Sequence, residues 1–404
     1  MRFAVVGDVH ERWSGDADGA ALRALGAHHA IWVGDIGNSE NVELVRQIAG
    51  LDFPKSVILG NHDAWTQLSA RGRASATKRM RVTAAPADAL RLQQLSPGGG
   101  GDGEPARSPV HLQLDALGDA HVGYREARLE GRRVAVVGAR PFSKGGSSWE
   151  SIAPFMSAVC GVDSMEASAE RIVSAAAPAA ARGDAVVMVA HNGPSGLGGA
   201  RHDICGVDWR KEEGDHGDPD LRAALDTLAA RGAAPAAVVF GHMHHTLRGG
   251  GLRQMVRVDP ETGTAFLNAA TVPRVQRADA PGATLHHFLV FELIAGGVER
   301  AADVWVRVTR RAAGGGDANG GGAEECVAVV ESETDVLRTA RGEGGGVVRI
   351  VWDAHAQQWE HVPVPGGAAG ASGGGGAAAP DAREEGREPA GVAVAAARAK
   401  GGSR

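Results

Sequence analysis

Five short polar blocks constrain this chain more than any other feature of its sequence. They are Asp8-Val9-His10, Gly34-Asp35, Gly60-Asn61-His62-Asp63, His191-Asn192-Gly193-Pro194 and Gly241-His242-Met243-His244. Four of the blocks directly follow a short apolar run rich in β-branched residues, which is typical of a buried strand. The blocks are therefore expected where strands of a sheet end.

The spacing of the first three blocks indicates consecutive β-α-β units. Asp35 lies 27 residues after Asp8, and Asn61 lies 26 residues after Asp35. The predicted strands lie at 3–6, 31–33 and 56–59, and the predicted helices at 17–25 and 39–49. Because parallel strands present their carboxyl ends to one crevice, we expect the three blocks to converge at one edge of one sheet.

The two later blocks repeat this arrangement. Apolar runs at 184–190 and 236–240 predict buried strands that end at the fourth and fifth blocks. In an extended segment alternate residues point the same way, so His242 and His244 should face one side and Met243 the other. One strand end could then deliver two imidazoles to neighbouring metal ions.

The residue types in the blocks are those of a site for two borderline divalent metal ions. Aspartate supplies charge, histidine supplies a neutral nitrogen, and asparagine supplies an uncharged oxygen. This mixture favours Mn, Fe or Zn over Ca or a thiolate-bound structural Zn. Two such ions held together activate a water and stabilise the leaving oxygen of a phosphate ester. Five blocks in order at strand ends make a dinuclear centre the favoured hypothesis.

The order of the blocks resembles the calcineurin-like metallophosphoesterase superfamily, over a matching core of roughly residues 1–308. The resemblance implies an α/β fold in which two sheets form a sandwich, with the metal ions where the strand ends meet. It also implies a phosphoric ester hydrolase with two divalent or mixed-valence ions (Mn, Fe or Zn). A phosphatase, a phosphodiesterase and a pyrophosphohydrolase all fit this description.

Carried over residue by residue, the resemblance implies a complete set of metal ligands. Those implied for the first ion are Asp8, His10 and His244, and those implied for the second ion are Asn61, His191 and His242. Asp35 would bridge both ions, and a hydroxide shared by the ions would attack phosphorus. His62 would protonate the leaving group or hold the phosphate, with Asp63 orienting it. An alternative is that His62 only orients a ligand.

Four further segments resemble a subgroup found in cyanobacteria and in the plastid lineage of algae and plants. They are 138–146 (GARPFSKGG), 204–209 (ICGVDW), 214–221 (GDHGDPDL) and 267–274 (LNAATVPR). Arg140 and Lys144 lie in a Gly-rich turn and are candidates to bind phosphate, with a purely structural turn as the alternative. His216 is a third candidate for substrate contact, because the loop that holds it is long for a plain connection.

Composition agrees with a soluble enzyme, and the resemblance implies that its partner is a small phosphorylated substrate. The net charge of −6 gives no global electrostatic reason to bind nucleic acid or an anionic membrane. No apolar run is long enough to span a bilayer. The three cysteines are far apart and form no C-x-x-C pair, which suits a reducing compartment. We expect a cytoplasmic protein, or a chloroplast one if an upstream transit sequence is missing from this chain.

Three low-complexity stretches divide the chain. None can bury enough apolar surface to offset the entropy lost on ordering. We therefore expect a catalytic domain at 1–310 with a surface insertion at 96–109, a Gly-rich linker at 311–325 and a disordered tail at 366–404. Strand-like runs between the linker and the tail predict a small β extension at 326–365.

The remaining elements follow from local signals. Ser164 is a candidate N-cap for a helix at 165–177, and Asp218 is a candidate N-cap for a helix that has Pro219 at its first position. The β-rich stretch after the fifth block predicts consecutive antiparallel strands that close the second sheet. These predicted strands lie at 255–258, 264–267, 286–293 and 304–308.

Two other function classes stay open at this stage. One is a non-catalytic metal-binding scaffold on the same fold. The other is a nuclease, which shares the metal chemistry but would need a basic surface that this composition does not favour. The complete ligand set and the presence of His62 favour the hydrolase.

Overall fold

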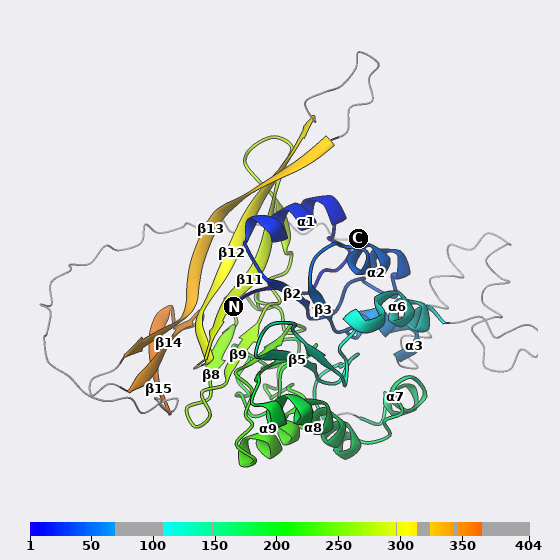
Figure 1. Cartoon of the computed structure of the whole chain (residues 1–404), viewed down its shortest axis with the longest axis vertical. Coiled ribbons are helices and arrows are strands. Elements are labelled where there is room, and N and C mark those ends of the chain that lie inside the picture. Colours follow the sequence, from blue (N-terminus) through cyan, green and yellow to red (C-terminus); the bar gives the residue numbers. More distant parts are fainter. Residues whose placement is uncertain (69–107, 148, 296, 313–323, 342–345, 366–404) are drawn as a thin grey trace, which may run out of the picture. The chain divides into compact units, whose positions relative to one another are not determined.

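The computed structural model describes residues 1–68, 108–147, 149–295, 297–312, 324–341 and 346–365 (Figure 1). Most of the predicted insertion, most of the predicted linker and the whole predicted tail lie outside these residues. The predicted division into domains therefore stays a prediction. No helix within the described ranges is long and apolar enough to cross a membrane.

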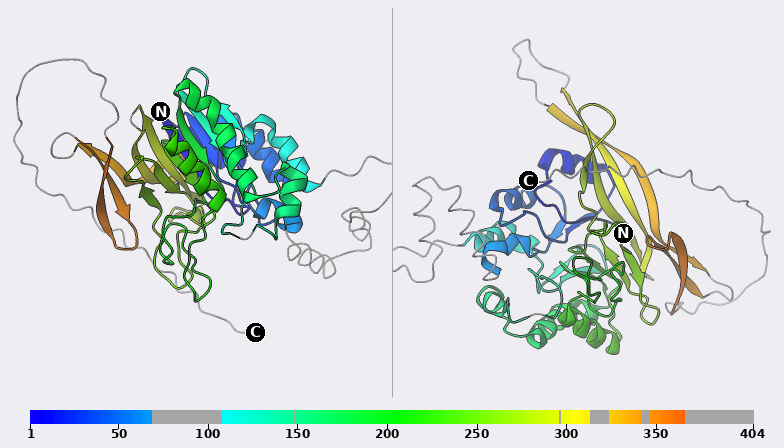
Figure 2. Two further views of the ribbon diagram at one scale, coloured as in Figure 1. Left: turned by 90° about the horizontal axis from the view of Figure 1, so that it is seen from below. Right: turned by 180° about the vertical axis from the view of Figure 1, so that it is seen from behind.

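Two β-sheets form the centre of the fold (Figures 1 and 2). The strands of the first sheet are β1 (Arg2–Val6), β2 (His29–Trp32), β3 (Lys55–Val57), β10 (Val275–Arg277), β11 (Ala283–Ile294), β12 (Gly297–Ala312), β13 (Glu324–Arg341), β14 (Val347–Asp353) and β15 (Gln358–Val364). Those of the second sheet are β4 (Glu126–Arg128), β5 (Val134–Gly138), β6 (Ala185–Val189), β7 (Ala237–Phe240), β8 (Val256–Val258) and β9 (Ala265–Asn268). The predicted two-sheet α/β sandwich is confirmed.

Helices connect these strands. Over the described residues, the α-helices are α1 (Gly15–Ala24), α2 (Val42–Ala49), α3 (Trp65–Leu68), α6 (Pro109–Leu117), α7 (Ala153–Cys160), α8 (Met165–Arg182) and α9 (Pro219–Ala230). Two short 3-10 helices are η1 (His62–Ala64) and η2 (Gly118–Ala120). Helices α8 and α9 lie together against the second sheet, as Figure 2 shows from two sides.

The three N-terminal strands are parallel neighbours, as their spacing predicts. The order of the first sheet is β15-β14-β13-β12-β11-β1-β2-β3, with β10 paired to β11. Val5 of β1 lies beside Ile31 of β2, and Trp32 of β2 lies beside Val57 of β3. The polar blocks that follow these strands therefore leave the sheet at the same edge.

Alternation along β1 explains how the sheets pack. Val5 belongs to an apolar cluster that also holds Val187 of β6 and Val239 of β7, so one face of β1 packs against the second sheet. Ala4 and Val6 belong to a second cluster, which includes residues of the helices. A strand buried on both faces reads as a continuous apolar run, which is the pattern that precedes each block.

The predicted role of the strands after the fifth block is wrong in part. β8 and β9 join the second sheet, in the order β4-β5-β6-β7-β9-β8, and β9 runs parallel to β7. β11 and β12 instead join the first sheet, where β11 pairs antiparallel with β1. The reason is that β1 has β2 on one side only, and β11 supplies apolar side chains such as Phe288 and Leu289 to both clusters.

The two predicted helix starts have different outcomes. Ser164 is the N-cap of α8, and its side chain accepts a hydrogen bond from the backbone N–H of Ala167 at 3.1 Å. That helix continues past Pro178 to Arg182, beyond the predicted end. Helix α9 begins at Pro219 as predicted, but the Asp218 side chain makes no capping hydrogen bond, because its carboxylate is part of a buried ion pair with Arg140.

Candidate metal centre

Side chains from both sheets meet where the strands end. Asp8 follows β1 and Asp35 follows β2, while His191 follows β6 and His242 follows β7. The ring nitrogen Nδ1 of His191 lies 2.7 Å from the carbonyl oxygen of Val33, which joins the second sheet to the first at this point. The convergence expected from the sequence therefore brings together the ends of two sheets.

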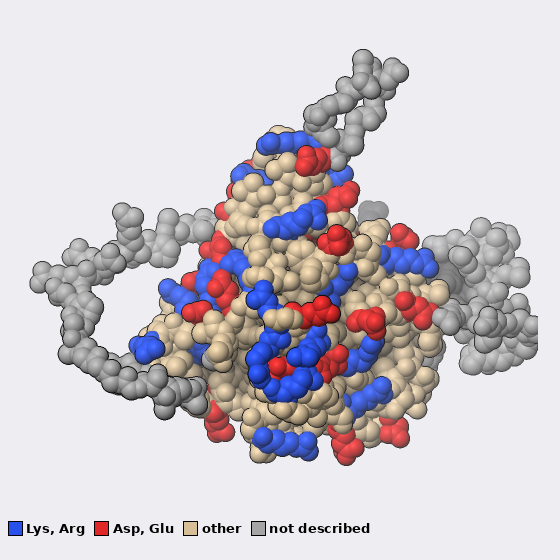
Figure 3. Space-filling view, viewed as in Figure 1, with Lys and Arg blue, Asp and Glu red and all other residues tan. Residues whose placement is uncertain are grey.

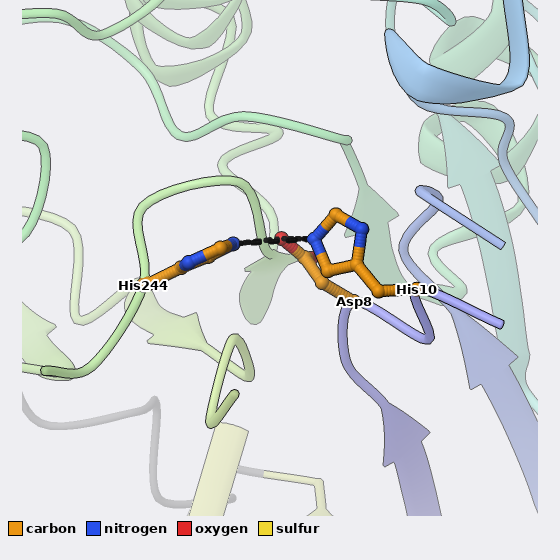
Figure 4. Close-up of side chains that lie close together, drawn as sticks. All are labelled: Asp8, His10 and His244. Carbon is orange, nitrogen blue, oxygen red and sulfur yellow. Dashed lines mark hydrogen bonds and ion pairs between the residues drawn. The ribbon is translucent and has the colours of Figure 1, made fainter. Parts of the chain in front are cut away.

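The first cluster consists of Asp8, His10 and His244, whose side chains lie together in Figure 4. Nε2 of His244 lies 3.3 Å from Oδ2 of Asp8 and 3.3 Å from Nε2 of His10. The Asp8 side chain is buried, whereas the His244 side chain is 43 % exposed. A ligand from solvent can therefore approach these atoms from the His244 side.

The second cluster consists of Asp35, His191 and His242, and it lies deeper in the protein. Nε2 of His191 lies 3.3 Å from Oδ1 of Asp35 and 3.0 Å from Oδ1 of Asn61. The rings of His191 and His242 meet edge to face with their centroids 5.0 Å apart. All seven residues that the sequence predicts as metal ligands thus lie in or against these two clusters.

The chemistry of the second cluster fits a bound cation. The carbonyl oxygen of Val33 can only accept a hydrogen bond, so Nδ1 of His191 carries the proton. In the neutral ring Nε2 then presents a lone pair, and it faces the side-chain oxygens of Asp35 and Asn61. Three electron-rich atoms that face one another in a buried site need a proton or a metal ion between them.

The charges at the site support the same interpretation. Burial alone would lower the pKa of His191, but the charge and hydrogen bond of Asp35 raise it to about 10. Burial alone would raise the pKa of Asp35, but His191 holds it well below its ordinary range. Burial and the charge of His191 lower the pKa of His242 to about 3, so this ring is neutral. When no ion is bound, a proton on His191 offsets the buried carboxylate, and a metal ion would displace that proton.

Three candidate ligands adopt left-handed backbone conformations, which are uncommon for residues that carry a side chain. The φ angle is +45° at His10, +50° at Asp35 and +65° at His242. The last block is therefore not extended, which differs from the prediction. His242 and His244 still reach neighbouring clusters, and Met243 is buried. Strained conformations of this kind concentrate at functional sites, where the surrounding packing enforces them.

Gly60 allows the polar atoms of the second cluster to approach the backbone. A Cβ atom at this position would lie 2.3 Å from Oδ1 of Asp35 and 2.5 Å from Cε1 of His191. Both neighbours are candidate ligands held by other contacts, so neither can move without changing the centre. Glycine is therefore required at this position for a reason of space.

We expect Gly60→Ala to weaken metal binding, on the order of 10- to 100-fold, because it displaces two ligands at once. Titration of the purified variant with Mn²⁺ measures this loss. Gly15→Ala is the matched control, since a Cβ at Gly15 would meet nothing within 4 Å. Metal affinity equal in the two variants would contradict the proposed closeness of Asp35 and His191.

His62 lies beside the clusters, and its ring orientation is fixed. Its backbone N–H donates to Oδ1 of Asp35 at 2.8 Å, and Nε2 lies 4.0 Å from Oδ2 of the same residue. Its Nδ1 lies 2.9 Å from the carbonyl oxygen of Asn38, which can only accept, so Nδ1 carries a proton. The ring stacks on Trp65 with centroids 4.7 Å apart. These contacts leave Nε2 on the side of the metal centre.

The structure corrects the expected role of Asp63. Its carboxylate is fully buried and accepts hydrogen bonds from the backbone N–H groups of Ile36, Gly37 and Gly60. Asp63 therefore holds the loops that carry the candidate ligands Asp35 and Asn61, while the carbonyl of Asn38 orients the His62 ring. The cause is local, because residues 62–64 form the 3-10 helix η1, which turns the Asp63 side chain inward.

Trp65 is a residue of the site that the sequence analysis missed. It stacks on His62 with an angle of 9° between the ring planes, and so limits rotation of the imidazole. His62 and Trp65 are three residues apart, the spacing that places two side chains on one face of a helix. The sequence therefore carries a signal for this contact, in the spacing of His62 and Trp65.

The three predicted substrate contacts have different surroundings. Arg140 is buried and forms ion pairs with Asp218 at 2.9 Å and with Asp220 at 2.8 Å. Its guanidinium is therefore occupied by these carboxylates and does not face solvent, where a substrate phosphate would approach. His216 is half-buried, and its Nε2 lies 2.8 Å from the carbonyl oxygen of Lys144. Its ring lies nearly parallel to that of His242, with centroids 5.8 Å apart. His216 therefore borders the second cluster, and the Lys144 carbonyl contacts the His216 ring.

We expect Arg140→Met to lower the free energy of unfolding by about 3–5 kcal/mol, because it leaves two buried carboxylates without their cation. Denaturant unfolding of the metal-loaded protein measures this loss. Arg125→Met is the matched control, since Arg125 pairs with Asp119 at 2.8 Å on the surface and such pairs contribute little. Similar losses for the two variants would show that the ion pairs of Arg140 with Asp218 and Asp220 contribute no more to stability than a surface pair.

Three comparisons with known proteins bear on the identity of this chain. Residues 1–246 match the model of the calcineurin-like phosphoesterase family (Metallophos), which is more than half of the 404 residues. Among solved structures, the chain is similar to a dimetal phosphatase from Danio rerio, at 13 % sequence identity and a TM-score of 0.39. That similarity covers 82 % of this chain and 99 % of the zebrafish chain. No curated protein matches the chain.

Proposed function

Because this chain belongs to the calcineurin-like phosphoesterase family, we propose that it hydrolyses a phosphoester with a dinuclear metal centre. The observation that carries the proposal is the pair of adjoining clusters of metal-ligand type, one open to solvent and one buried. The substrate is a small phosphorylated molecule, either a phosphomonoester or a small phosphodiester or nucleotide.

The chain offers separate ligands for each ion. Those for the first ion are Asp8, His10 and His244, and those for the second are Asn61, His191 and His242. Asp35 contributes to both, and its position supports this, because its carboxylate lies 3.3 Å from Nε2 of His191 and its charge also acts on Asp8. Two bound divalent ions would polarise the phosphate and supply a hydroxide nucleophile near neutral pH.

His62 is the proposed proton donor. Its Nδ1 is committed to the Asn38 carbonyl, so only Nε2 can give a proton to the departing oxygen. Trp65 and Asn38 hold the ring, and Nε2 lies 4.0 Å from Oδ2 of Asp35, on the side of the metal centre. Asp63 supports the loops beneath through its three backbone hydrogen bonds.

The alternative is a non-catalytic scaffold that binds the metal ions without turnover. The fixed orientation of His62 favours the enzyme, since a scaffold has no use for a proton donor beside its metal ions. A nuclease is not favoured, because the net charge of −6 provides no global basic surface. The face in Figure 3 carries acidic side chains among the basic ones. The cyanobacterial and plastid-lineage subgroup, and a cytoplasmic or chloroplast location, remain part of the proposal.

The experiment that separates enzyme from scaffold measures metal content and turnover on the same sample. The full chain is stripped with a chelator, reloaded with Mn²⁺, Fe²⁺ or Zn²⁺, and assayed on an aryl phosphate. We expect two ions per chain and hydrolysis that the chelator abolishes and added metal restores. Two ions without hydrolysis of any mono- or diester would make the protein a scaffold.

A further inference from the structure

One exposed aromatic side chain near the metal centre is not explained by the proposed chemistry. The Trp209 side chain is 41 % exposed, although contact of a large apolar side chain with water is unfavourable. Its ring meets that of His216 edge to face, with centroids 4.7 Å apart. His216 in turn lies nearly parallel to His242, a candidate ligand of the second ion. The indole is therefore two ring contacts away from the metal centre.

Backbone hydrogen bonds hold the loop that carries Trp209 in place. The N–H of Val207 donates to the carbonyl of Gly214 at 2.9 Å, and the N–H of His216 donates to the carbonyl of Cys205 at 2.9 Å. These bonds form a small hairpin with Trp209 near its tip. The position of the exposed indole is thus set by the backbone, and little further order is lost when a ligand binds to it.

The Gly-rich turn at 138–146 packs against the ring of His216. A Cβ at Gly145 would lie 2.5 Å from Cδ2 of His216, and a Cβ at Gly146 would lie 3.0 Å from its Nδ1. Nε2 of His216 donates to the carbonyl of Lys144, and the N–H of Gly146 donates to the carbonyl of His216. The turn therefore fixes His216 between Trp209 and the metal centre.

We propose that Trp209 and His216 form an aromatic wall, and that this wall binds a planar aromatic group attached to the phosphate of the substrate. The inference rests on the proposed phosphoester hydrolysis and narrows its substrate class. Flat π-systems stack on indole and imidazole rings whatever their substituents. A nucleobase and a simple aryl group share this chemistry, and both occur in phosphate esters. The wall would orient such an ester while the metal centre holds its phosphate.

The test compares three esters on the metal-loaded full chain. Adenosine 5′-monophosphate carries a nucleobase, phenyl phosphate carries an aryl ring, and glycerol phosphate carries neither. We expect Trp209→Ala to raise KM about 5- to 150-fold for the aromatic esters, the usual contribution of one stacked base, with no change for glycerol phosphate. Trp209→Phe should restore most of the loss, since it keeps an aromatic face.

Comparison of adenosine monophosphate with phenyl phosphate also identifies which kind of aromatic group the wall binds. A loss confined to adenosine monophosphate assigns the wall to a nucleobase, and a loss confined to phenyl phosphate assigns it to an aryl ring. Ile294→Ala is the matched control, because Ile294 is 46 % exposed and lies at the end of β11 near Met1, away from the metal centre. An equal loss on all three esters would make Trp209 a mere support for His216 and would overturn the proposal, as would no loss at all.

A binding measurement keeps the inference separate from the proposed function. Dissociation constants are measured by calorimetry on the Mn²⁺-loaded protein for inorganic phosphate and for the phosphonate analogues of adenosine monophosphate and phenyl phosphate, whose C–P bond is not hydrolysed. We expect an aromatic phosphonate to bind more tightly than inorganic phosphate in the wild type, and this advantage to vanish in Trp209→Ala. If the wild type hydrolyses no ester, the proposed function fails, but the affinity difference between the aromatic ligand and inorganic phosphate still tests the aromatic wall. Equal affinities in the wild type would overturn the aromatic wall.

Discussion

Asp35→Asn should lower turnover by on the order of 10³-fold and release metal from the centre. The carboxylate offsets the repulsion between two nearby dications, and an amide of the same shape cannot. Losing the stabilisation that metal ions give to a transition state costs several kcal/mol, which corresponds to this factor. Metal analysis of the purified variant and its kcat on an aryl phosphate measure the effect.

Asp18→Asn is the control that separates this effect from the loss of any buried carboxylate. Asp18 is also fully buried and pairs with Arg274 at 2.8 Å, but it lies outside both clusters. We expect the Asp18 variant to lose stability while it keeps its metal content and turnover. If Asp35→Asn retained two ions and full activity, the assignment of the bridging residue would be wrong.

His62→Ala should keep the metal content and lower kcat by roughly 10²- to 10⁴-fold, the usual contribution of a positioned proton donor. The loss should be larger for alkyl esters than for nitrophenyl esters, because a nitrophenolate leaves without needing a proton. Trp65→Ala should show a milder form of the same pattern, since the His62 ring then rotates more freely. Steady-state kinetics on both classes of ester measure the difference.

His361→Ala serves as the control for removal of an imidazole, because His361 is exposed on β15 and should not affect kcat. An equal loss for alkyl and aryl esters with a raised KM would make His62 a phosphate-binding group. Loss of metal from the His62 variant would make it a ligand. Either result would contradict the proposed proton transfer.

The position of the candidate centre could be predicted from the sequence because its determinants are local. Each polar block follows a buried strand, and parallel neighbours such as β1 and β2 end at the same edge. The chain direction and the strand period therefore fix where Asp8 and Asp35 lie before any long-range contact is known. The sandwich of two sheets, with the block residues where their strands end, was instead implied by the family resemblance.

The pairing of the later strands could not be predicted in the same way. The pairing of β11 with β1 joins residues that are far apart in the sequence, such as Val5 and Leu289, and no turn or spacing signals it. A β-rich stretch looks the same whether it joins one sheet or the other. The choice depends on which strand edge is free and which apolar cluster must be filled, and both are tertiary properties.

Roles that depend on the exact direction of a side chain were also beyond the sequence. Asp218 has the residue type and the following proline of a helix cap, yet Arg140 draws its carboxylate into a buried ion pair. Asp63 follows His62 directly, yet η1 turns it toward the backbone of Ile36 and Gly37. In both cases a local pattern was outweighed by a buried group that needed a partner.

The central claim is that two metal ions sit side by side in these clusters, and electron paramagnetic resonance of the Mn²⁺-loaded protein tests it most directly. Ions about 3.5–4 Å apart, the separation typical of two-metal sites, are magnetically coupled. We expect the full chain to bind two Mn²⁺ ions and give the spectrum of a coupled pair, and Asp35→Asn to lose that spectrum. One ion per chain, or two that give the six-line signal of isolated Mn²⁺, would contradict the dinuclear centre.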